Sequence, residues 1–446
     1  MLDTLPPDVA TQHPSIPLPV TQPAHWHLAT RLAFRFTTLY FGLYVLTTQM
    51  LGGLLPFGFL PDLGATGWMK GVVRVAAKDI FHISTFVTTT TGSGDKIIDW
   101  VHAFCLLLFA AVGTAAWSAI DRKRPNYAAL NTWVRVFLRF ALGSTMVGYG
   151  MVKAIPLQMG APSVQRLVEP YGNFSPMGVL WSSIGASFPY ERFAGSMELL
   201  GAVLLFIPRL SLLGAMVTFA TAVQIFTLNM TYDVPVKLFS FHLILISLAL
   251  ITPDARRLLN VMVLNKTAHP STEIPLFRRR NLVRLAVALQ IVFGGYILFT
   301  NYSSARESWT QFGGGAPKSP LYGIWNVEEM RVDGVVRSPL VSDYGRWRRL
   351  LFQNPAGVTF QRMDDSFQGY GAKVEPDGKT LALTNAADKN WTAKFAIDRP
   401  GNGDRMVLDG QMDGHTIRFD LRRVDHTKFL LLSRRFNWVQ ERPFNR

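Results

Sequence analysis

The sequence contains a single cysteine, Cys105, among its 446 residues. One cysteine excludes an intrachain disulfide, and it also excludes a Cys-x-x-Cys redox or zinc motif. Charged residues are scarce in the first part of the chain. Residues 1–317 hold 24 Lys and Arg and 14 Asp and Glu, whereas the 129 residues that follow hold 21 and 16. So few charges exclude an ordinary soluble domain for residues 1–317, and the contrast indicates a membrane part followed by a soluble part.

Seven segments between residues 31 and 308 are rich enough in apolar residues to predict membrane helices. The hydrocarbon core of a bilayer requires about 20 apolar residues in helical form. Four uncharged runs meet or approach this length, namely 36–61, 103–120, 210–232 and 285–305. Three weaker segments, 132–153, 191–208 and 236–253, are interrupted by ionisable residues. We therefore expect about seven transmembrane helices, preceded by a polar tail over residues 1–30.

The distribution of basic residues predicts the orientation of these helices. The connections at 121–124, 209 and 254–284 carry 11 Lys and Arg residues and fall on one side if the helices alternate. The opposite connections carry six, which are Lys70, Arg74, Lys78, Lys96, Arg166 and Arg192. By the positive-inside rule the amino terminus lies in the cytoplasm, and seven crossings place residues 318–446 outside, in the periplasm of a bacterium that has one.

The spacing of Lys70, Arg74 and Lys78 predicts a short helix in the first outer connection. These residues recur every four positions among apolar ones, as in an amphipathic helix lying on the membrane surface. A solvated helix packed against the bundle explains the pattern equally well.

The hydrophobic period changes from helical to alternating after Tyr322. Alternating apolar and polar residues at 358–363, 380–384, 392–397 and 416–421 are typical of half-buried strands. Asp-Gly pairs at 333–334, 377–378, 409–410 and 413–414 are typical of hairpin turns. With a flexible linker at 309–317, the sequence predicts an antiparallel β-barrel or sandwich of about eight strands over residues 318–446.

Two side-chain groups in this β-domain need an interpretation. Four tryptophans, Trp325, Trp347, Trp391 and Trp438, are expected in its core rather than in a ligand site, and the basic cluster 346–349 is expected on a solvated strand face. The opening Leu-Tyr-Gly-Ile-Trp-Asn-Val-Glu at 321–328 resembles the Gly-x-Trp start of lipocalin-like barrels. The resemblance implies a barrel that holds a small ligand or docks a partner.

Ionisable residues inside the apolar segments indicate a functional site. Each charge at bilayer depth costs at least about 2.5–3.5 kcal/mol, so it requires a reason. The predicted topology places five of them near the outer leaflet or about one turn deeper: Lys153, Glu198, Asp233, Lys237 and His242. We predict that they converge on one outward-opening pocket, with His242, Glu198 and Lys153 as catalytic groups. The predicted ligand-binding residues are Tyr149, Gln158, Asn229, Tyr232, Asp233 and Lys237.

Each of these residues also has a purely structural interpretation. Glu198 could pair with Arg135 or Arg139 and join two helices. The Lys153 side chain could extend to the membrane interface, and His242 could donate a hydrogen bond to a backbone carbonyl. Asp233 lies at a loop boundary, where an aspartate commonly caps a helix.

Histidines provide little evidence for a metal site. His25 and His27 are separated by one residue in the polar tail, and no pair of histidines in the apolar segments has the arrangement of a bis-histidine haem site. We therefore predict no metal.

Residues 135–255 resemble the DoxX family of bacterial membrane proteins. The resemblance rests on Tyr149-Gly-x-x-Lys153, the helix around Glu198 that continues to Gly201, Arg209 with Gly214-Ala215, the 229–242 segment and Pro253-Asp254. It implies a four-helix membrane unit in the bacterial inner membrane. Some members of the family are subunits of quinone-reducing oxidoreductases. The chain departs from the family pattern in its additional amino-terminal helices and its fused β-domain.

Three functions remain open from the sequence. The first is a redox-associated membrane protein that binds a quinone-type lipid, with protons exchanged by His242 and Glu198 and an oxygen anchored by Lys153 or Lys237. The sequence shows no electron carrier, so this function requires a partner or a soluble electron donor. The second is an accessory subunit whose β-domain docks a larger membrane or periplasmic assembly. The third is a small-molecule carrier, for which an inverted repeat would be expected. No interaction with nucleic acid is expected.

Overall fold

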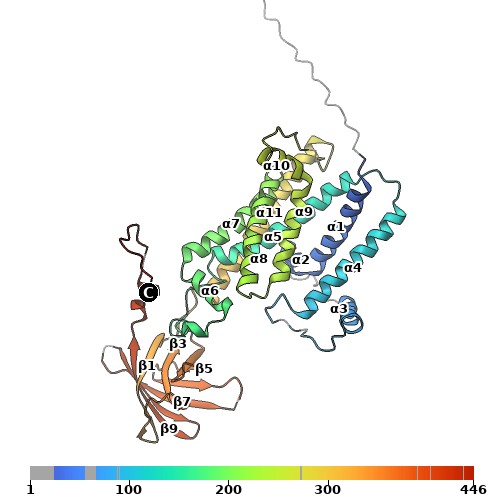
Figure 1. The fold of residues 1–446 in the computed structure, drawn as a ribbon. Helices are drawn as coiled ribbons and strands as arrows, with labels where there is room; N and C mark the ends of the chain where they lie inside the picture. The colour runs from blue at the N-terminus through green and yellow to red at the C-terminus, as the bar shows by residue number, and fades with distance from the viewer. Residues whose placement is uncertain are drawn as a thin grey trace, which may run out of the picture.

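The structure, a computed structural model, describes residues 25–55, 67–87, 89, 91–271, 274–388, 390–401, 403–434 and 436–445. These residues form a helical domain followed by a β-barrel (Figure 1). Most of the predicted polar tail, and the end of the first predicted membrane segment, lie outside the described residues.

The helical domain contains eleven α-helices among the described residues: α1 Leu28–Thr47, α2 Gln49–Leu54, α3 Gly67–Val75, α4 Ile97–Ile120, α5 Ala128–Ala154, α6 Pro176–Gly185, α7 Phe188–Phe206, α8 Ser211–Thr231, α9 Lys237–Ile251, α10 Ala255–Met262 and α11 Arg280–Gln311. The long helices run alternately between two ends of the domain (Figure 1). We call the end that faces the barrel the barrel end. The opposite end carries α10.

Each of the seven predicted membrane segments contains a helix, but four of the described helices are both long and apolar enough to cross a membrane. These are Ile97–Ile120, Pro208–Thr231, Lys237–Met262 and Arg280–Gln311. They indicate a membrane protein. The other three segments correspond to α1, α5 and α7, which contain charged residues such as Arg35, Arg139 and Glu198. The count of seven crossings therefore stays a prediction.

Two short helices, α3 and α6, accompany the long ones. The segment around Lys70 and Arg74 is the amphipathic helix α3, which buries Met69 and Val73 while both basic side chains are exposed. The segment before α7 contains α6, whose first turn is capped by the Ser175 hydroxyl accepting the N–H of Gly178.

Helices α5 and α7 approach closely because glycines face each other between them. A Cβ atom on Gly150 would lie 2.8 Å from the carbonyl oxygen of Gly195, and one on Gly195 would lie 2.5 Å from the backbone nitrogen of Ala154. Small residues at such crossings let helix backbones pack tightly in membrane proteins. This contact fixes the register in which Lys153 on α5 faces Glu198 on α7.

The carboxy-terminal domain is a closed antiparallel barrel of eight strands. The strands are β1 Gly323–Val332, β3 Trp347–Phe352, β4 Gly357–Arg362, β5 Phe367–Val374, β6 Thr380–Thr384, β7 Thr392–Asp398, β8 Arg405–Met412 and β9 His415–Val424, with β2 Val335–Val336 added at the end of β1. Neighbouring strands pair in sequence order, and β1 also pairs with β9. This last pairing closes the barrel and excludes a sandwich. The prediction of about eight antiparallel strands is confirmed.

The barrel interior is filled by side chains. Trp325, Trp347, Phe360, Phe395 and Phe419 lie at its centre and are almost completely buried. Such close packing of aromatic rings is typical of a barrel core. The prediction of core tryptophans is correct for Trp325 and Trp347. Trp391 is half-buried and stacks on Tyr370, and the prediction is wrong for Trp438, which is 90 % exposed.

Two further sequence expectations for the barrel are wrong. The Asp409-Gly410 pair lies inside β8 rather than in a turn, while Asp333-Gly334 and Asp413-Gly414 do form hairpin turns with positive φ. The Arg346 side chain is buried rather than solvated, and its guanidinium donates to the carbonyl oxygens of Arg337, Val327 and Trp347.

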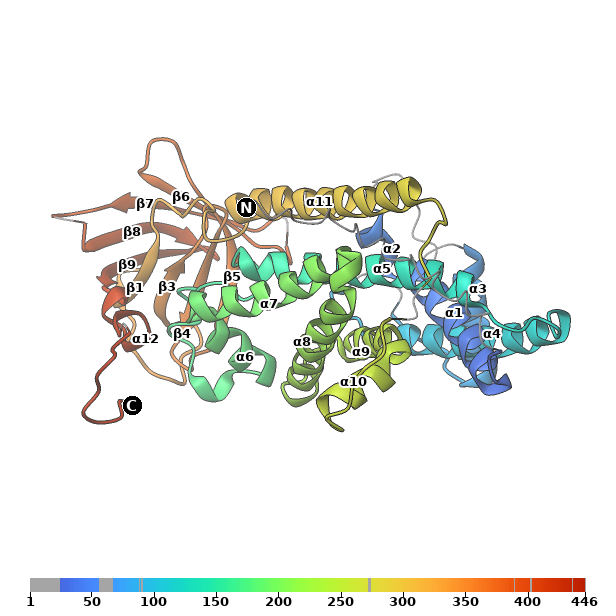
Figure 2. The same cartoon turned by 90° about the horizontal axis from the view of Figure 1, so that it is seen from above.

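The barrel packs against the connection that follows α5 (Figure 2). Val164 lies in an apolar cluster with Ile324 and Leu351 from the outer surface of the barrel. The N–H of Val164 donates to Oε1 of Gln353 at 3.1 Å, and Nε2 of Gln361 donates to the carbonyl of Val168 at 3.3 Å. The barrel is therefore attached to the helical domain next to the end of α5.

Candidate functional site

The central feature of the site is a buried ion pair between α5 and α7. Nζ of Lys153 lies 2.9 Å from Oε2 of Glu198, and the two side chains are 7 % and 4 % exposed. The ammonium also donates to the carbonyl oxygen of Tyr149 at 3.3 Å and lies 5.5 Å from the centre of its ring. The alternative in which Glu198 pairs with Arg135 or Arg139 is wrong.

A pocket of about 70 Å³ opens beside Lys153. It lies among α5, α6, α8 and α9 near the barrel end, and its apolar wall includes Leu180, Ile225, Leu228, Phe239 and Leu243. Four predicted site residues line it, namely Tyr149, Lys153, Gln158 and Asn229. Glu198 does not line the pocket itself, but it is ion-paired with Lys153, which does.

The Gln158 side chain supplies the pocket with a hydrogen-bond acceptor that no described residue satisfies. Oε1 of Gln158 is buried and has no hydrogen-bond partner among the described residues. The backbone carbonyl of the same residue accepts the indole N–H of Trp181 at 3.0 Å. A buried acceptor without a donor costs about 1–3 kcal/mol, so the atom is better satisfied when a water or ligand donor occupies the pocket.

Asn229 and Tyr149 are held in place by neighbouring groups. Nδ2 of Asn229 donates to the hydroxyl of Ser240 at 3.0 Å and to the carbonyl of Val236 at 3.3 Å. The hydroxyl of Tyr149 accepts a hydrogen bond from Gln49 at 3.4 Å, a weak contact at the edge of the domain. These contacts leave the Oδ1 atom of Asn229 and the ring of Tyr149 as the groups that a ligand could meet.

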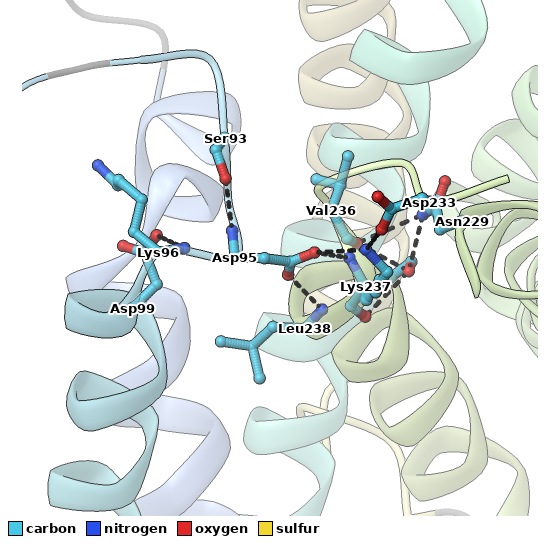
Figure 3. Close-up of polar contacts among 10 residues, drawn as sticks. Ser93, Asp95, Lys96, Asp99, Asn229, Asp233, Val236, Lys237 and Leu238 are labelled. Atoms are coloured by element: carbon cyan, nitrogen blue, oxygen red, sulfur yellow. Dashed lines mark hydrogen bonds and ion pairs between the residues drawn. The ribbon is translucent and has the colours of Figure 1, made fainter. Parts of the chain in front are cut away.

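Asp233 lies in the turn between α8 and α9, Lys237 is the first residue of α9, and neither lines the pocket. They form an ion pair of 2.8 Å in which the Asp233 side chain is 82 % exposed. The carboxylate of Asp95 accepts the backbone N–H groups of Lys237 and Leu238 (Figure 3). Because Asp95 occupies the position of a cap, the suggestion that Asp233 caps this helix is wrong. Asp95 was not predicted, since it lies in a connection 142 residues earlier in the chain.

His242 faces α1 rather than the pocket. Its Nδ1 lies 2.7 Å from the carbonyl oxygen of Leu238, and its Nε2 lies 2.7 Å from the hydroxyl of Tyr40. A carbonyl only accepts, so Nδ1 carries the proton, and Nε2 of the neutral ring accepts the Tyr40 hydroxyl. The ring stacks on Tyr44 with centroids 3.9 Å apart. This geometry matches the structural interpretation, a histidine that donates to a backbone carbonyl.

The structure thus brings together part of the predicted site. Lys153, Tyr149, Gln158 and Asn229 line one pocket, and Glu198 is paired with Lys153 behind it. His242, Asp233 and Lys237 lie elsewhere. Tyr232 is half-buried in an apolar cluster with Leu180 and Val234 and does not line the pocket. Trp181 and Met159 also line the pocket. Neither is ionisable and both lie outside the predicted membrane segments, so nothing in the sequence singled them out.

Comparisons with family models, with curated proteins and with solved structures found no match to this chain. Among the residues that the structure describes, no three His, Cys, Asp or Glu side chains are grouped so that they could hold a metal ion.

Proposed function

We propose that the helical domain binds a quinone-type lipid or a similar small ring with hydrogen-bonding oxygens in the pocket beside Lys153. The observation that carries this proposal is the buried Lys153–Glu198 pair next to an apolar pocket. Lysine at this position supplies a hydrogen-bond donor for a ligand oxygen, and the glutamate is close enough to share its proton.

The size of the pocket limits how such a ligand binds. Its volume of about 70 Å³ is less than half of the about 150 Å³ of an engineered cavity that holds benzene. A ring therefore enters by one edge, with an oxygen directed toward Lys153, unless α6 moves outward. Trp181 and Met159 on the α6 side form the wall that would have to shift.

The proposed setting is the bacterial inner membrane, with a DoxX-like unit formed by residues 135–255. In support of a four-helix unit, α5 packs against α7, α7 against α8 and α8 against α9, while α9 returns to α5. The amino terminus would lie in the cytoplasm and the barrel in the periplasm. A redox role in this setting requires electrons from a partner or a soluble donor. His242 takes no part in this role, because it faces α1 and not the pocket.

The proposal is tested by extracting the full-length protein into nanodiscs and quantifying bound quinone by mass spectrometry. The test variant is Lys153→Met/Glu198→Leu, which removes both charges together. The matched control is Lys237→Gln, since Lys237 lies outside the pocket. We expect quinone with wild type and the control and a loss of at least tenfold in the double variant. Equal retention by all three proteins, or none by wild type, would contradict the proposal.

A second candidate function is that of an accessory subunit, and the end of the chain favours it. Phe436, Trp438 and Val439 follow the barrel and are each at least three-quarters exposed. The rings of Phe436 and Trp438 also contact each other, with centroids 4.9 Å apart, and contiguous exposed apolar side chains are typical of a protein contact site. A stoichiometric partner that is lost with Phe436→Ser/Trp438→Ser, but kept by the Lys153→Met/Glu198→Leu variant, would support this function.

A further inference from the structure

A buried glutamate near the start of α7 takes no part in the contacts described so far. Glu191 lies in the first turn of this helix and is 0 % exposed. Its Oε1 accepts the backbone N–H of Met159 at 3.1 Å, whereas its Oε2 is also buried and has no hydrogen-bond partner among the described residues. An ionised carboxylate is costly to bury in this way, so Oε2 requires a proton, a water or a ligand.

Met159, the residue that Glu191 holds, lies between two hollows. Met159 and Trp181 line both the pocket beside Lys153 and a second hollow of about 290 Å³. Because the Glu191 carboxylate accepts the backbone N–H of Met159, it is attached to the wall that separates the two.

The second hollow, which we call the outer hollow, lies at the barrel end of the domain. It is lined by residues 159–163, Arg166, Ser175 and part of α6. At this end α6 leads into α7 (Figure 2). Arg166 and Ser175 are exposed, so water reaches the hollow. Since Arg166 is paired with Glu169 at 2.7 Å, its charge is balanced and gives no reason to expect an anionic ligand here.

The Lys153 side chain starts between the two carboxylates of α7. Glu191 and Glu198 are seven residues apart, which is about two turns and about 10 Å along the helix. Gly195 lies between them, and a Cβ atom there would lie 2.7 Å from the Cβ of Lys153. The ammonium contacts Glu198 at 2.9 Å, and its charge also acts on the carboxylate of Glu191. A flexible side chain with a four-carbon stem can exchange one partner for the other.

Lys153, Glu191 and Glu198 are not balanced in charge. One ammonium neutralises one carboxylate, and the nearby Arg192 is exposed, where solvent screens its charge. A second buried carboxylate without a partner is costly, so the set is neutral when one of the two carboxyl groups carries a proton. Acidic and basic side chains grouped inside membrane helices are typical of proton relays.

We infer that Glu191 is a proton-relay residue that connects water in the outer hollow with the Lys153–Glu198 pair. The inference rests on the proposed function, in which this pair exchanges protons with a ligand oxygen. When Lys153 gives its proton to the ligand, the Glu191 carboxyl replaces it, and the resulting carboxylate takes up a proton from solvent through the outer hollow. Only protons move in this relay, and the electrons come from the donor of the proposed function.

The first test asks whether Glu191 holds a proton, and it requires no bound quinone. Infrared difference spectra of the full-length protein in nanodiscs are recorded across a pH titration in H₂O and in D₂O. Glu191→Gln keeps Oε1 for the Met159 N–H but cannot ionise, and Glu307→Gln is the matched control at an exposed glutamate of α11. We expect the C=O band of a protonated carboxyl in wild type and in the control, and its loss in Glu191→Gln.

The second test measures the delivery of protons to bound quinone. Quinone-loaded protein is mixed with dithionite, which supplies the electrons, and the formation of quinol, which also takes up protons, is followed by absorbance. We expect Glu191→Gln to retain quinone as wild type does but to form quinol about 100-fold more slowly, the usual size of a general acid's effect. Glu191→Asp, which keeps a carboxyl, should recover part of the rate.

The two tests separate this inference from the proposed function. Absence of quinone from wild type contradicts the proposed function and the delivery of protons to a ligand, while the infrared titration still decides whether Glu191 exchanges protons with solvent. The inference is overturned if the infrared band persists in Glu191→Gln, if that variant forms quinol at the wild-type rate, or if Glu307→Gln slows the reaction equally. A slow rate that Glu191→Asp does not raise would mean that Glu191 has a structural role and relays no proton.

Discussion

The carboxylate of Asp95 accepts the backbone N–H of Leu238 at 2.8 Å and that of Lys237 at the same distance. Both donors belong to the first turn of α9, whose own N-cap residue, Val236, has no side chain that can accept them. The N–H of Gly94 also donates to the carbonyl of Pro235. The segment before α4 thus supplies the cap of a helix distant in sequence, and it joins the two at the barrel end.

We predict that Asp95→Asn destabilises the protein by about 1–3 kcal/mol, the usual cost of leaving one buried backbone N–H without an acceptor. Each carboxylate oxygen of Asp95 accepts one N–H, and an asparagine retains only one of these acceptors. Thermal unfolding of the full-length protein in detergent measures the change. The matched control is Asp233→Asn, the same substitution at an exposed residue with positive φ that asparagine tolerates. Equal effects of the two substitutions would refute the role of Asp95.

Much of the fold could be predicted from the sequence, because the spacing of apolar residues distinguishes strands from helices. The alternating segments became β4, β6, β7 and β9, and the uncharged runs contain long helices. The prediction of a turn at Asp409-Gly410 is wrong because this glycine is required by packing inside a strand, not by a turn. Gly410 lies where the neighbouring strand leaves no room for a side chain, which is a property of packing rather than of local sequence.

The candidate site was only partly predictable for a related reason. From the sequence, Lys153 and Glu198 stand out as ionisable residues within apolar segments. The sequence alone left Arg135 and Arg139 as alternative partners for Glu198. The partner is decided by the register of α5 against α7, which the contact of Gly150 with Gly195 sets. Likewise, packing decides that His242 on α9 faces Tyr40 and Tyr44 of α1 and not the pocket.

We predict that Lys153→Met alone destabilises the protein by about 3–5 kcal/mol, because it leaves the buried Glu198 carboxylate without its partner. The double variant Lys153→Met/Glu198→Leu should recover most of this loss, since an apolar pair in the same space is often neutral. Unfolding temperatures of the two variants and of wild type provide the measurement. A double variant that is no more stable than Lys153→Met would mean that the two side chains do not act as a pair.

The barrel should lose stability in acid, partly through Asp343. Hydrogen bonds from Arg337 at 2.5 and 2.7 Å hold the pKa of the Asp343 carboxyl below its ordinary value of 3.8. A carboxyl with a lowered pKa in the folded state stabilises the fold above its unfolded pKa, and this stabilisation is lost as the pH falls through the folded value. We expect the unfolding temperature to fall below about pH 4, and to fall less steeply in Arg337→Gln. Identical pH profiles of the two proteins would show that this pair does not contribute.

Gly410 and Gly369 provide the sharpest test of the barrel register, since both lie within strands of the closed sheet. A Cβ atom at position 410 would lie 2.0 Å from the carbonyl oxygen of Lys394 and 2.8 Å from Cα of Phe395, so backbone atoms would have to move. We expect Gly410→Ala to cost about 3 kcal/mol or more, at the upper end of overpacking effects. At position 369 no atom lies within 4 Å of such a Cβ, and alanine there should be neutral or slightly stabilising.

Protease susceptibility of the barrel in the full-length protein distinguishes the two variants. Equal resistance would mean that β7 and β8 do not pair as described, because the close approach of Lys394 to Gly410 follows directly from that pairing.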